Sequence, residues 1–273
     1  IAPMDAMIIA ADSSNIEARV LAWLANEKDL LNEFRNNEDI YANLASTIYG
    51  RPINSQDDPL ERFVGKTAVL GLGYGMGWKK FQSTLAIGQG GKRHFISHTD
   101  AQNVVNTFRR ERIKTVDLWR ECQAAISEMI DPKGHFYIAR LLKVEASGIV
   151  LPNGLKLRYP LIKIISPDDN QYFSETVFGK DETRTYGGKI VENIVQALSR
   201  QIIAEQMLMV EELVKEVNGC VVLTVHDEIV SVVPEDYVTE MEHEIIEIMR
   251  TPPSWASGLP LDAEAGSARE YSK

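Results

Sequence analysis

The sequence predicts an α+β fold, with an antiparallel sheet packed by helices and a second, mostly helical region. Strand-like apolar runs lie near opposite ends of the chain, at 7–11 and at 220–225 and 228–233. Between them, hydrophobic residues recur at helical spacing over long stretches. A chain of 273 residues, 44% of them hydrophobic, is long enough for one large domain or two closely joined subdomains.

The first strand is expected to lead directly into a helix. Ser14 and Glu17 form an S-x-x-E capping box at the start of that helix, and the apolar residues that follow recur every three or four positions. A second helical stretch is expected at 30–50, and the turn-rich residues 51–58 should end it.

A further helix is expected to begin at Asp58. This residue is a suitable N-cap, Pro59 suits the first turn, and Glu61 is a first-turn acid. Glycines at positions 71, 73, 75 and 77 then either end the helix or let another backbone or a base approach closely. A phosphate-binding P-loop is disfavoured, because the pattern G-x-x-x-x-G-K-[ST] does not occur in the sequence.

The remaining elements follow from the same patterns of periodicity and turn residues. Residues 167–188 are polar and turn-rich, so a loop or mobile insertion is expected there. The other expected elements are a helix at 100–129, a hairpin within 134–160 with its turn at 152–154, a long helix at 188–217, a hairpin at 220–233, a helix at 236–249 and a short last strand at 259–265.

Composition limits the possible cellular settings. The chain lacks a run approaching the roughly 20 apolar residues of a membrane helix, and it lacks a signal-peptide pattern, so we expect no membrane partner and a cytoplasmic location. Its only cysteines, Cys122 and Cys220, are too few for a disulfide framework, which favours a reducing compartment.

The net charge and the local charge clusters favour opposite conclusions about a nucleic-acid partner. The net charge of −10 argues against a nucleic-acid partner, because phosphate backbones favour basic proteins. Basic residues nevertheless gather at 62–93 and again at 109–114. The second cluster has two interpretations, a solvated helix face or a binding surface.

Two acids more than two hundred residues apart carry the strongest functional indication. Asp12 ends the first apolar run, and Asp227 follows the run at 220–225, so each lies where a strand stops. Hard cations such as Mg²⁺ take oxygen ligands and often combine one or two protein carboxylates with substrate phosphates. The two acids together therefore predict a site for divalent cations.

The helix that begins near Asp58 carries a second indication. Arg62, Lys66, Leu70 and Tyr74 recur every four residues, which places them along one helix face. Two cations on one face are suited to a triphosphate, with Tyr74 nearer the base or sugar. The alternative is an exposed helix whose charges have no special role.

These segments resemble motifs A, B and C of the DNA polymerase I family (family A). Asp12 and Glu17 match motif A. Motif B is matched by Arg62, Lys66 and Tyr74-Gly75, and motif C by His226-Asp227-Glu228. The sequence of residues 15–23 most resembles that of the phage branch of this family. The resemblance implies a palm at 1–32 and 186–273 and fingers at 33–185, with thumb and exonuclease domains absent from this chain and supplied by a separate or missing N-terminal part.

The resemblance also implies a function, which is template-directed DNA synthesis from deoxynucleoside triphosphates on a primer–template DNA. Asp12, Asp227 and the backbone carbonyl of Ser13 would hold two Mg²⁺ ions, and Glu228 would be auxiliary. Arg62 and Lys66 would neutralise the triphosphate, with Lys66 also a proton donor to the leaving group. Glu17 paired with Tyr74 would exclude a ribose 2′-hydroxyl. The other implied contacts are Asn15 and Leu70 for the nucleotide, and His226, Gln196 and Gly75 for DNA.

Three departures from the family pattern and three alternative functions accompany this interpretation. Leu70 stands where the family usually has Phe or Tyr, Ser13 replaces a common Tyr, and Glu192-Asn193 matches the family only loosely. The alternatives are a single-subunit RNA polymerase, a two-metal phosphohydrolase or nuclease, and a non-catalytic or partner-dependent fragment of a split polymerase. A test of nucleotide selection would distinguish the RNA polymerase. The basic helix face argues against the phosphohydrolase or nuclease. Primer extension by this chain would test the non-catalytic fragment.

Overall fold

The computed structural model describes residues 1–88, 91–165 and 175–271. Its contacts divide the chain into a sheet unit, Ile1–Val20 with Val195–Lys273, and a helical unit, Leu21–Ile194. The two boundaries fall inside helices α1 (Ile16–Ala25) and α8 (Gly187–Lys215). This division does not test the expected boundaries between palm and fingers, which lie after residue 32 and after residue 185. They stay a prediction.

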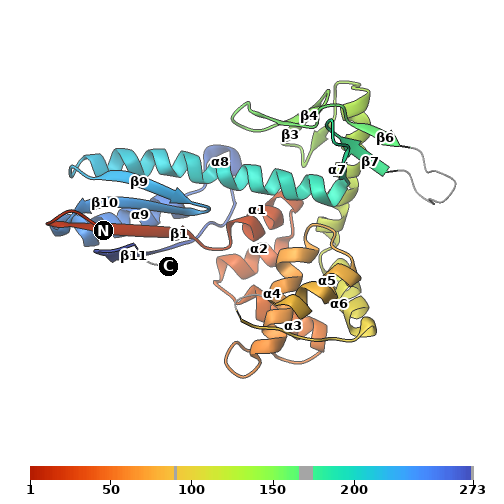
Figure 1. Ribbon diagram of the computed structural model, residues 1–273, viewed down its shortest axis with the longest axis horizontal. Coiled ribbons are helices and arrows are strands. Elements are labelled where there is room, and N and C mark those ends of the chain that lie inside the picture. Colours follow the sequence, from red (N-terminus) through yellow and green to blue (C-terminus); the bar gives the residue numbers. More distant parts are fainter. Residues whose placement is uncertain (89–90, 166–174, 272–273) are drawn as a thin grey trace. The chain divides into compact units, whose positions relative to one another are not determined.

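The sheet unit contains one four-stranded antiparallel sheet. Its strand order is β11-β1-β10-β9, so the first strand of the chain lies between two strands from the other end (Figure 1). Helix α9 packs on β1 and β11. The elements are β1 (Ala6–Ser13), β9 (Cys220–Val225), β10 (Glu228–Pro234), the short 3₁₀ turns Glu235–Tyr237 and Ser254–Ala256, α9 (Val238–Arg250) and β11 (Ala263–Ala268).

Burial explains this strand order. Ile8, Ile9 and Ala11 of β1 are buried, as are Ile229 and Val230 of β10, so these two strands form the centre of the sheet. Strand β9 is an edge strand and is largely exposed. A bulge interrupts its pairing, and Glu211 of α8 accepts the backbone N–H of Val221 at 2.7 Å, two features that make the edge less able to pair with another strand.

The long helix and the hairpin after it form as the sequence predicts. Helix α8 covers 187–215, against the expected 188–217. The turn after the helix contains a left-handed Asn218, with φ of 61°, and the N–H of Gly219 donates to the carbonyl of Val214 at 2.7 Å. Strands β9 and β10 then form the expected hairpin around His226 and Asp227.

The helical unit contains helices α2 to α7 and two small antiparallel sheets, of order β2-β3-β4-β5 and β6-β7-β8. Its elements are α2 (Lys28–Arg35), α3 (Ile40–Tyr49), α4 (Pro59–Leu72), α5 (Trp78–Ile87), α6 (His98–Glu111), α7 (Ile113–Ile130), β2 (Tyr137–Ile138), β3 (Leu142–Glu145), β4 (Gly148–Val150), β5 (Lys156–Arg158), β6 (Lys163–Ile165), β7 (Glu175–Phe178) and β8 (Thr183–Thr185).

Two expected helices are each divided in the structure. The stretch at 30–50 forms α2 and α3, because Asn37 adopts a left-handed φ of 54° and Asp39 caps a new helix. The stretch at 100–129 forms α6 and α7, which meet at Arg112, a residue outside the helical region of backbone space. Arg112 is buried and pairs with Glu33 at 3.5 Å, so a tertiary contact accompanies the break.

Other expectations in this unit also change. The predicted loop at 167–188 is wrong in part, because 175–178 and 183–185 pair as β7 and β8, and only 166–174 lie outside the described residues. Helix α5 was not expected. The hairpin with a turn at 152–154 is present as β4 and β5. In the sheet unit, the last strand starts at Ala263, four residues later than expected.

Helix α4 starts and ends near the predicted residues, but its first turn differs in detail. Pro59 is its first residue, and Asp58 does not cap it with its side chain. The Asp58 carboxylate instead accepts the N–H of Asn54 at 3.2 Å and pairs with Arg51 at 2.7 Å. The helix ends at Leu72, where the run of glycines begins.

Gly65 allows α4 to approach α3 closely. A Cβ atom at this position would lie 2.1 Å from the carbonyl oxygen of Tyr41. Backbone atoms cannot move aside as a flexible side chain can, so any larger residue would force the two helices apart. The close approach brings the N-terminal part of α4 to the start of α3.

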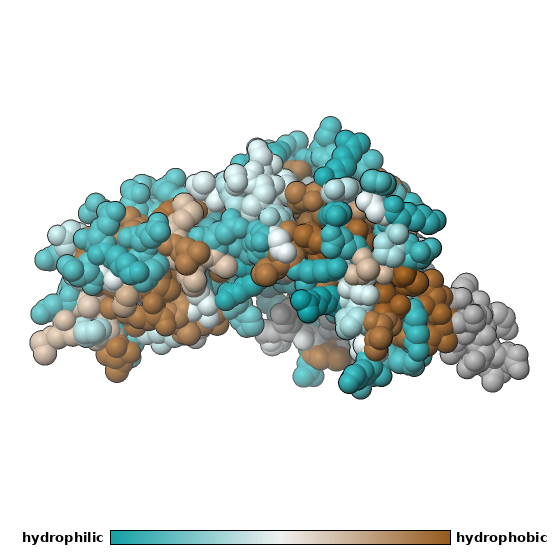
Figure 2. Space-filling view, turned by 90° about the horizontal axis from the view of Figure 1, so that it is seen from above, coloured by the Kyte–Doolittle hydropathy of each residue, from teal (hydrophilic) through white to brown (hydrophobic). Residues whose placement is uncertain are grey.

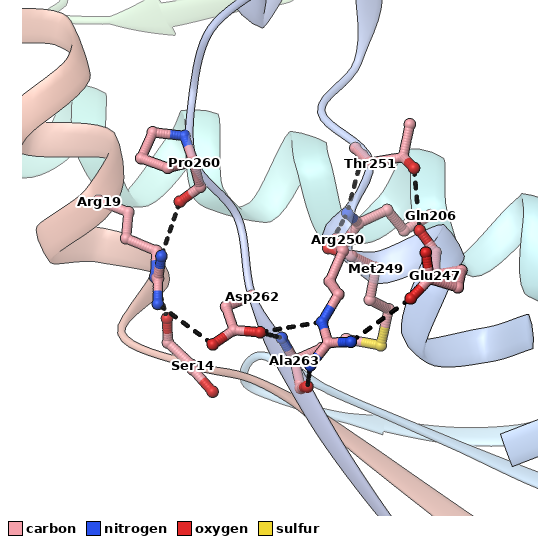
Figure 3. A network of polar contacts seen from close by, with 10 residues as sticks. All are labelled: Ser14, Arg19, Gln206, Glu247, Met249, Arg250, Thr251, Pro260, Asp262 and Ala263. Carbon is pink, nitrogen blue, oxygen red and sulfur yellow. Dashed lines mark hydrogen bonds and ion pairs between the residues drawn. The ribbon is translucent and has the colours of Figure 1, made fainter. Parts of the chain in front are cut away.

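A polar network fixes the turn between β1 and α1 within the sheet unit (Figure 3). The guanidinium of Arg19 donates to the carbonyls of Ser14 at 2.8 Å and Pro260 at 2.9 Å, and it pairs with Asp262 at 3.5 Å. The N–H of Ser14 donates to the carbonyl of Asp262 at 2.9 Å. Arg250 of α9 binds the other carboxylate oxygen of Asp262 at 3.0 Å. Asp262 therefore joins the turn to α9.

Within 1–88, 91–165 and 175–271, none of the helices is both long enough and apolar enough to cross a bilayer. Hydrophilic residues cover much of the face seen in Figure 2, with hydrophobic patches between them.

We expect Gly65→Ala to lower the free energy of unfolding by about 2 kcal/mol or more, because the new methyl group overlaps the backbone of α3. Gly71→Ala on the same helix is the control, since its nearest neighbour is the flexible end of Met76 at 2.7 Å. Urea unfolding followed by circular dichroism measures both. Equal stabilities would show that the helices can separate at little cost.

We expect Arg19→Met to lower the free energy of unfolding by about 2–4 kcal/mol, because it leaves the half-buried carbonyls of Ser14 and Pro260 without this donor and Asp262 without this cation. Arg269→Met is the control. Its exposed pair with Glu235 should contribute less than about 1 kcal/mol. The same urea experiment applies, and a loss for Arg19→Met no larger than that of the control would contradict a structural role for the network.

Candidate functional site

The two strand-end acids lie at the same end of the sheet. In the pairing of β1 with β10, Asp12 is opposite Glu228. One residue further along β1, the N–H of Ser13 donates to the carbonyl of Asp227 at 3.1 Å. Two segments separated by more than two hundred residues are therefore held side by side by backbone hydrogen bonds.

The β9–β10 hairpin turn places Asp227. Val225 pairs with Glu228, so His226 and Asp227 alone make the turn. His226 takes a left-handed φ of 55° and is exposed. Such tight turns require positive φ, and they hold the side chains at the tip in fixed directions.

Burial differs between the three acids of this site. Asp12 and Asp227 are half-buried, which leaves their carboxylates accessible, whereas Glu228 is only 3% exposed. Ser13 is 1% exposed, and within the described residues its hydroxyl has no hydrogen-bond partner. Asp12 and Asp227 can therefore meet a ligand directly, while Glu228 lies beneath the surface.

The residues after Asp12 lie in the turn and first helical turn held by Arg19. Asn15 is exposed, with a left-handed φ of 55°, and Glu17 is half-buried in the first turn of α1. Sequence reasoning missed Arg19 and Asp262. The one available signal was an arginine placed among the apolar residues of α1, since a buried cation needs partners.

The donor set fits a hard cation. Carboxylate oxygens are the ligands that Mg²⁺ takes, usually from one or two carboxylates, with water and phosphate oxygens completing the shell. Among the residues that the structure describes, no three histidine, cysteine, aspartate or glutamate side chains converge to hold a metal ion. A cation here would therefore rely on Asp12, Asp227 and its substrate.

The motif B residues belong to the helical unit. Arg62, Lys66 and Leu70 lie on α4, and Leu70 is 39% exposed. Tyr74 lies two residues beyond the end of the helix, so the predicted stripe of four residues does not lie on one helix; its last member follows in a turn. Lys66 is half-buried and makes no ion pair within the described part of the chain.

Arg62 has strong local partners. Its Nε donates to Asp39 at 2.5 Å, and its guanidinium lies 5.3 Å from the ring centroid of Tyr41. Partial burial raises the pKa of Asp39, but hydrogen bonds from Arg62 and from two backbone N–H groups of α3 outweigh it and lower the pKa below its usual value. The ion pair is therefore present at neutral pH and is lost as the pH falls through that lowered pKa.

Two aromatic residues anchor the segment that contains Tyr74. The indole N–H of Trp119 donates to the carbonyl of Gly73 at 2.7 Å, and the hydroxyl of Tyr186 donates to the carbonyl of Tyr74 at 3.3 Å. Both rings also line a cavity of about 580 Å³ in the helical unit. The other residues lining it are Gly75, Arg109, Arg110, Ile113, Val116, Arg120, Gln123, Gly187 and Gly188.

The structure divides the basic cluster at 109–114. Arg109 and Arg110 line the cavity, and Arg109 lies over the ring of Trp119 at 6.0 Å. Arg112 is buried at the break between α6 and α7 and has a structural role. The cluster is therefore neither one solvated face nor one binding surface. Sequence reasoning also missed Trp119, because nothing in its local sequence indicates a contact with Gly73.

Comparison with known proteins identifies the family. Residues 1–129 match the family described as DNA polymerase family A. The chain is 33% identical over 275 residues to a DNA polymerase of Bacillus phage SP02, covering 96% of this chain and 40% of the relative. It is 24% identical over 268 residues to a thermostable DNA polymerase I of Thermus filiformis, covering 97% and 27%. The chain thus spans less than half the length of these curated relatives.

A solved structure has the same fold. The POL domain of Pol1 from M. smegmatis, in complex with DNA primer-template and dNTP, has a TM-score of 0.69 and 19% identity, covering 98% of this chain and 41% of that chain. This likeness confirms the predicted α+β polymerase architecture of an antiparallel sheet with a helical subdomain. The sequence matches, together with motifs A and C side by side in one sheet, show that the chain belongs to DNA polymerase family A.

Proposed function

We propose that this chain carries the catalytic part of a DNA-directed DNA polymerase, which transfers nucleotides from dNTPs to a primer 3′-hydroxyl under the direction of a template. The observation that carries the proposal is the β1–β10 register, which brings Asp12, Asp227 and Glu228 together in a chain of this family. The named DNA polymerase relatives favour it over a phosphohydrolase.

Asp12 and Asp227 are the proposed ligands of two Mg²⁺ ions, together with the backbone carbonyl of Ser13. When bound, such ions lower the pKa of the attacking hydroxyl and neutralise the developing charge on the phosphates. The accessible carboxylates of Asp12 and Asp227 suit this position. Glu228, buried opposite Asp12, is assigned an auxiliary part because its burial keeps it from the solvent side.

The cations of α4 are proposed to bind the triphosphate. Arg62 and Lys66 lie one helical turn apart and would neutralise its charge, since phosphoryl transfer depends mainly on positioning and charge stabilisation. Lys66, which has no ion-pair partner among the described residues, is also assigned as proton donor to the departing pyrophosphate. Leu70 and Asn15 are assigned to the nucleotide site.

Contacts with primer–template DNA are assigned to exposed or glycine positions. His226 and Gln196 are exposed, and Gly75 borders the cavity next to Tyr74. The arginines and aromatic rings of that cavity suit an unpaired strand, because phosphates attract guanidinium groups and bases stack on aromatic faces.

Two further assignments follow from the family. The phage relative is much longer than the region matched here, which supports an N-terminal thumb and exonuclease part, on the same or another chain, as a partner. A DNA polymerase acts where DNA is replicated, so the host cytoplasm of a phage fits the expected location.

We expect Asp12→Asn and Asp227→Asn each to reduce primer extension by about 10³-fold or more while the protein stays folded, because each change removes one metal-binding charge. Asp236→Asn, an exposed acid of the same unit, is the control and should retain full activity. Activity within tenfold of the parent for both site variants would refute the proposed function.

We expect Glu17→Ala to raise the ratio of ribonucleotide to deoxynucleotide incorporation by more than about tenfold, a loss of roughly 1.4 kcal/mol in discrimination. A fixed carboxylate against the sugar excludes a 2′-hydroxyl by steric overlap. Single-nucleotide incorporation with matched ribo- and deoxyribonucleotides measures the ratio, with the exposed Glu244→Ala as control. An unchanged ratio would remove Glu17 as the sugar gate and favour the RNA polymerase alternative.

A further inference from the structure

The start of α3 holds the guanidinium of Arg62 on two sides. Its Nε donates to Asp39 Oδ2 at 2.5 Å, and its Cζ lies over the ring of Tyr41, 5.3 Å from the ring centroid. Within the described ranges, its two terminal nitrogens make no hydrogen bond. The side chain is 32% exposed, so a ligand can reach it while Nε stays bound to Asp39.

Asp39 divides its two carboxylate oxygens between different partners. Oδ1 accepts the backbone N–H groups of Tyr41 at 3.2 Å and Ala42 at 3.1 Å, which caps α3. Oδ2 is left for Arg62. Because the cap fixes the carboxylate to the helix, the carboxylate in turn fixes the direction of the guanidinium.

The backbone packing of α3 on α4 supports the same contact. Gly65, three residues after Arg62, lies against the carbonyl of Tyr41, so the two helices approach within a distance that excludes a Cβ atom. Arg62 therefore reaches the first turn of α3 without leaving its own helix. The contact depends on Asp39, Tyr41 and Gly65 together.

We propose that Asp39 is a positioning residue for triphosphate binding, which holds Arg62 by Nε so that its two terminal nitrogens face a phosphate. The inference rests on the proposed function, because it concerns the same nucleotide site. A guanidinium that is already oriented loses less freedom on binding, and its planar fork matches two phosphate oxygens. Asp39 itself does not touch the nucleotide.

A competing role for Asp39 would change the triphosphate affinity in the opposite direction. If Asp39 instead competed with the triphosphate for Arg62, removing its charge would free the guanidinium and tighten binding. The direction of the change in affinity therefore decides between positioning and competition.

The experiment uses Asp39→Asn and Asp39→Ser. Both residues cap helices well, so α3 should keep its N-cap while Arg62 loses its carboxylate partner. Asp58→Asn is the matched control, because the Asp58 carboxylate pairs with Arg51 at 2.7 Å and accepts the N–H of Asn54 at 3.2 Å, whereas the Arg62 side chain pairs with Asp39. Unfolding curves check that all three variants fold.

Two measurements follow. Calorimetric titration with inorganic tripolyphosphate gives an affinity that needs neither DNA nor catalysis. Primer extension gives KM for the dNTP and kcat. We expect both Asp39 variants to weaken tripolyphosphate binding and to raise KM by about three- to tenfold, with kcat within about twofold of the parent and the control unchanged.

Each other outcome is decisive. Unchanged or tighter tripolyphosphate binding in the Asp39 variants, or no binding by the parent, would overturn the positioning role. A parent that extends primers normally, with Asp39 variants equal to it, would overturn this inference alone. A parent that binds tripolyphosphate in an Asp39-dependent way but extends no primer would support the positioning of Arg62 and count against the proposed polymerase function.

Discussion

The candidate site depends on the antiparallel pairing of β1 with β10. This ladder places Asp12 opposite Glu228, and the bond from Ser13 to the carbonyl of Asp227 joins the strand end to the hairpin tip. Because side chains alternate along a strand, a slip of one residue would turn every side chain of β1 to the other face. The buried Ile9 on this strand makes such a slip costly, so the apolar core fixes the register and, through it, the position of the acids.

A second constraint acts on the turn that follows. Backbone pairing fixes Asp12, but the turn that carries Asn15 and leads to Glu17 would be free without further contacts. Arg19 donates to the carbonyl of Ser14 in that turn, and the backbone carbonyl of Asp262 accepts the N–H of Ser14. Arg19 also binds Pro260 and Asp262 outside the turn (Figure 3). Burial lowers the pKa of the Arg19 guanidinium and the carboxylate of Asp262 opposes this effect, which is the balance expected when a buried cation is stabilised by a paired acid.

The helical unit holds Arg62 and the segment of Tyr74 in a similar way. Arg62 is held by a carboxylate that also caps a helix, and the Tyr74 segment is held through its backbone by Trp119 and Tyr186. In both units, residues proposed to meet the substrate are oriented by neighbours that need not touch it. Such supporting contacts reduce the freedom that each side chain loses when a ligand binds.

The sequence by itself determined the elements that depend on local patterns. Apolar runs predicted β1, β9 and β10, the proline and acids predicted the start of α4, and Asn218-Gly219 predicted the end of α8. The resemblance of three segments to motifs A, B and C predicted the family, and the site residues that it implies stay a prediction. Tertiary structure decided what depends on contacts distant in sequence: the break at Arg112, which pairs with Glu33; the strands β7 and β8, whose short polar segments form a sheet only together with β6; and the partners of Arg19 and Arg62. Local patterns cannot reveal these features, because a buried charge or a short strand is stabilised by partners that only the folded chain brings close.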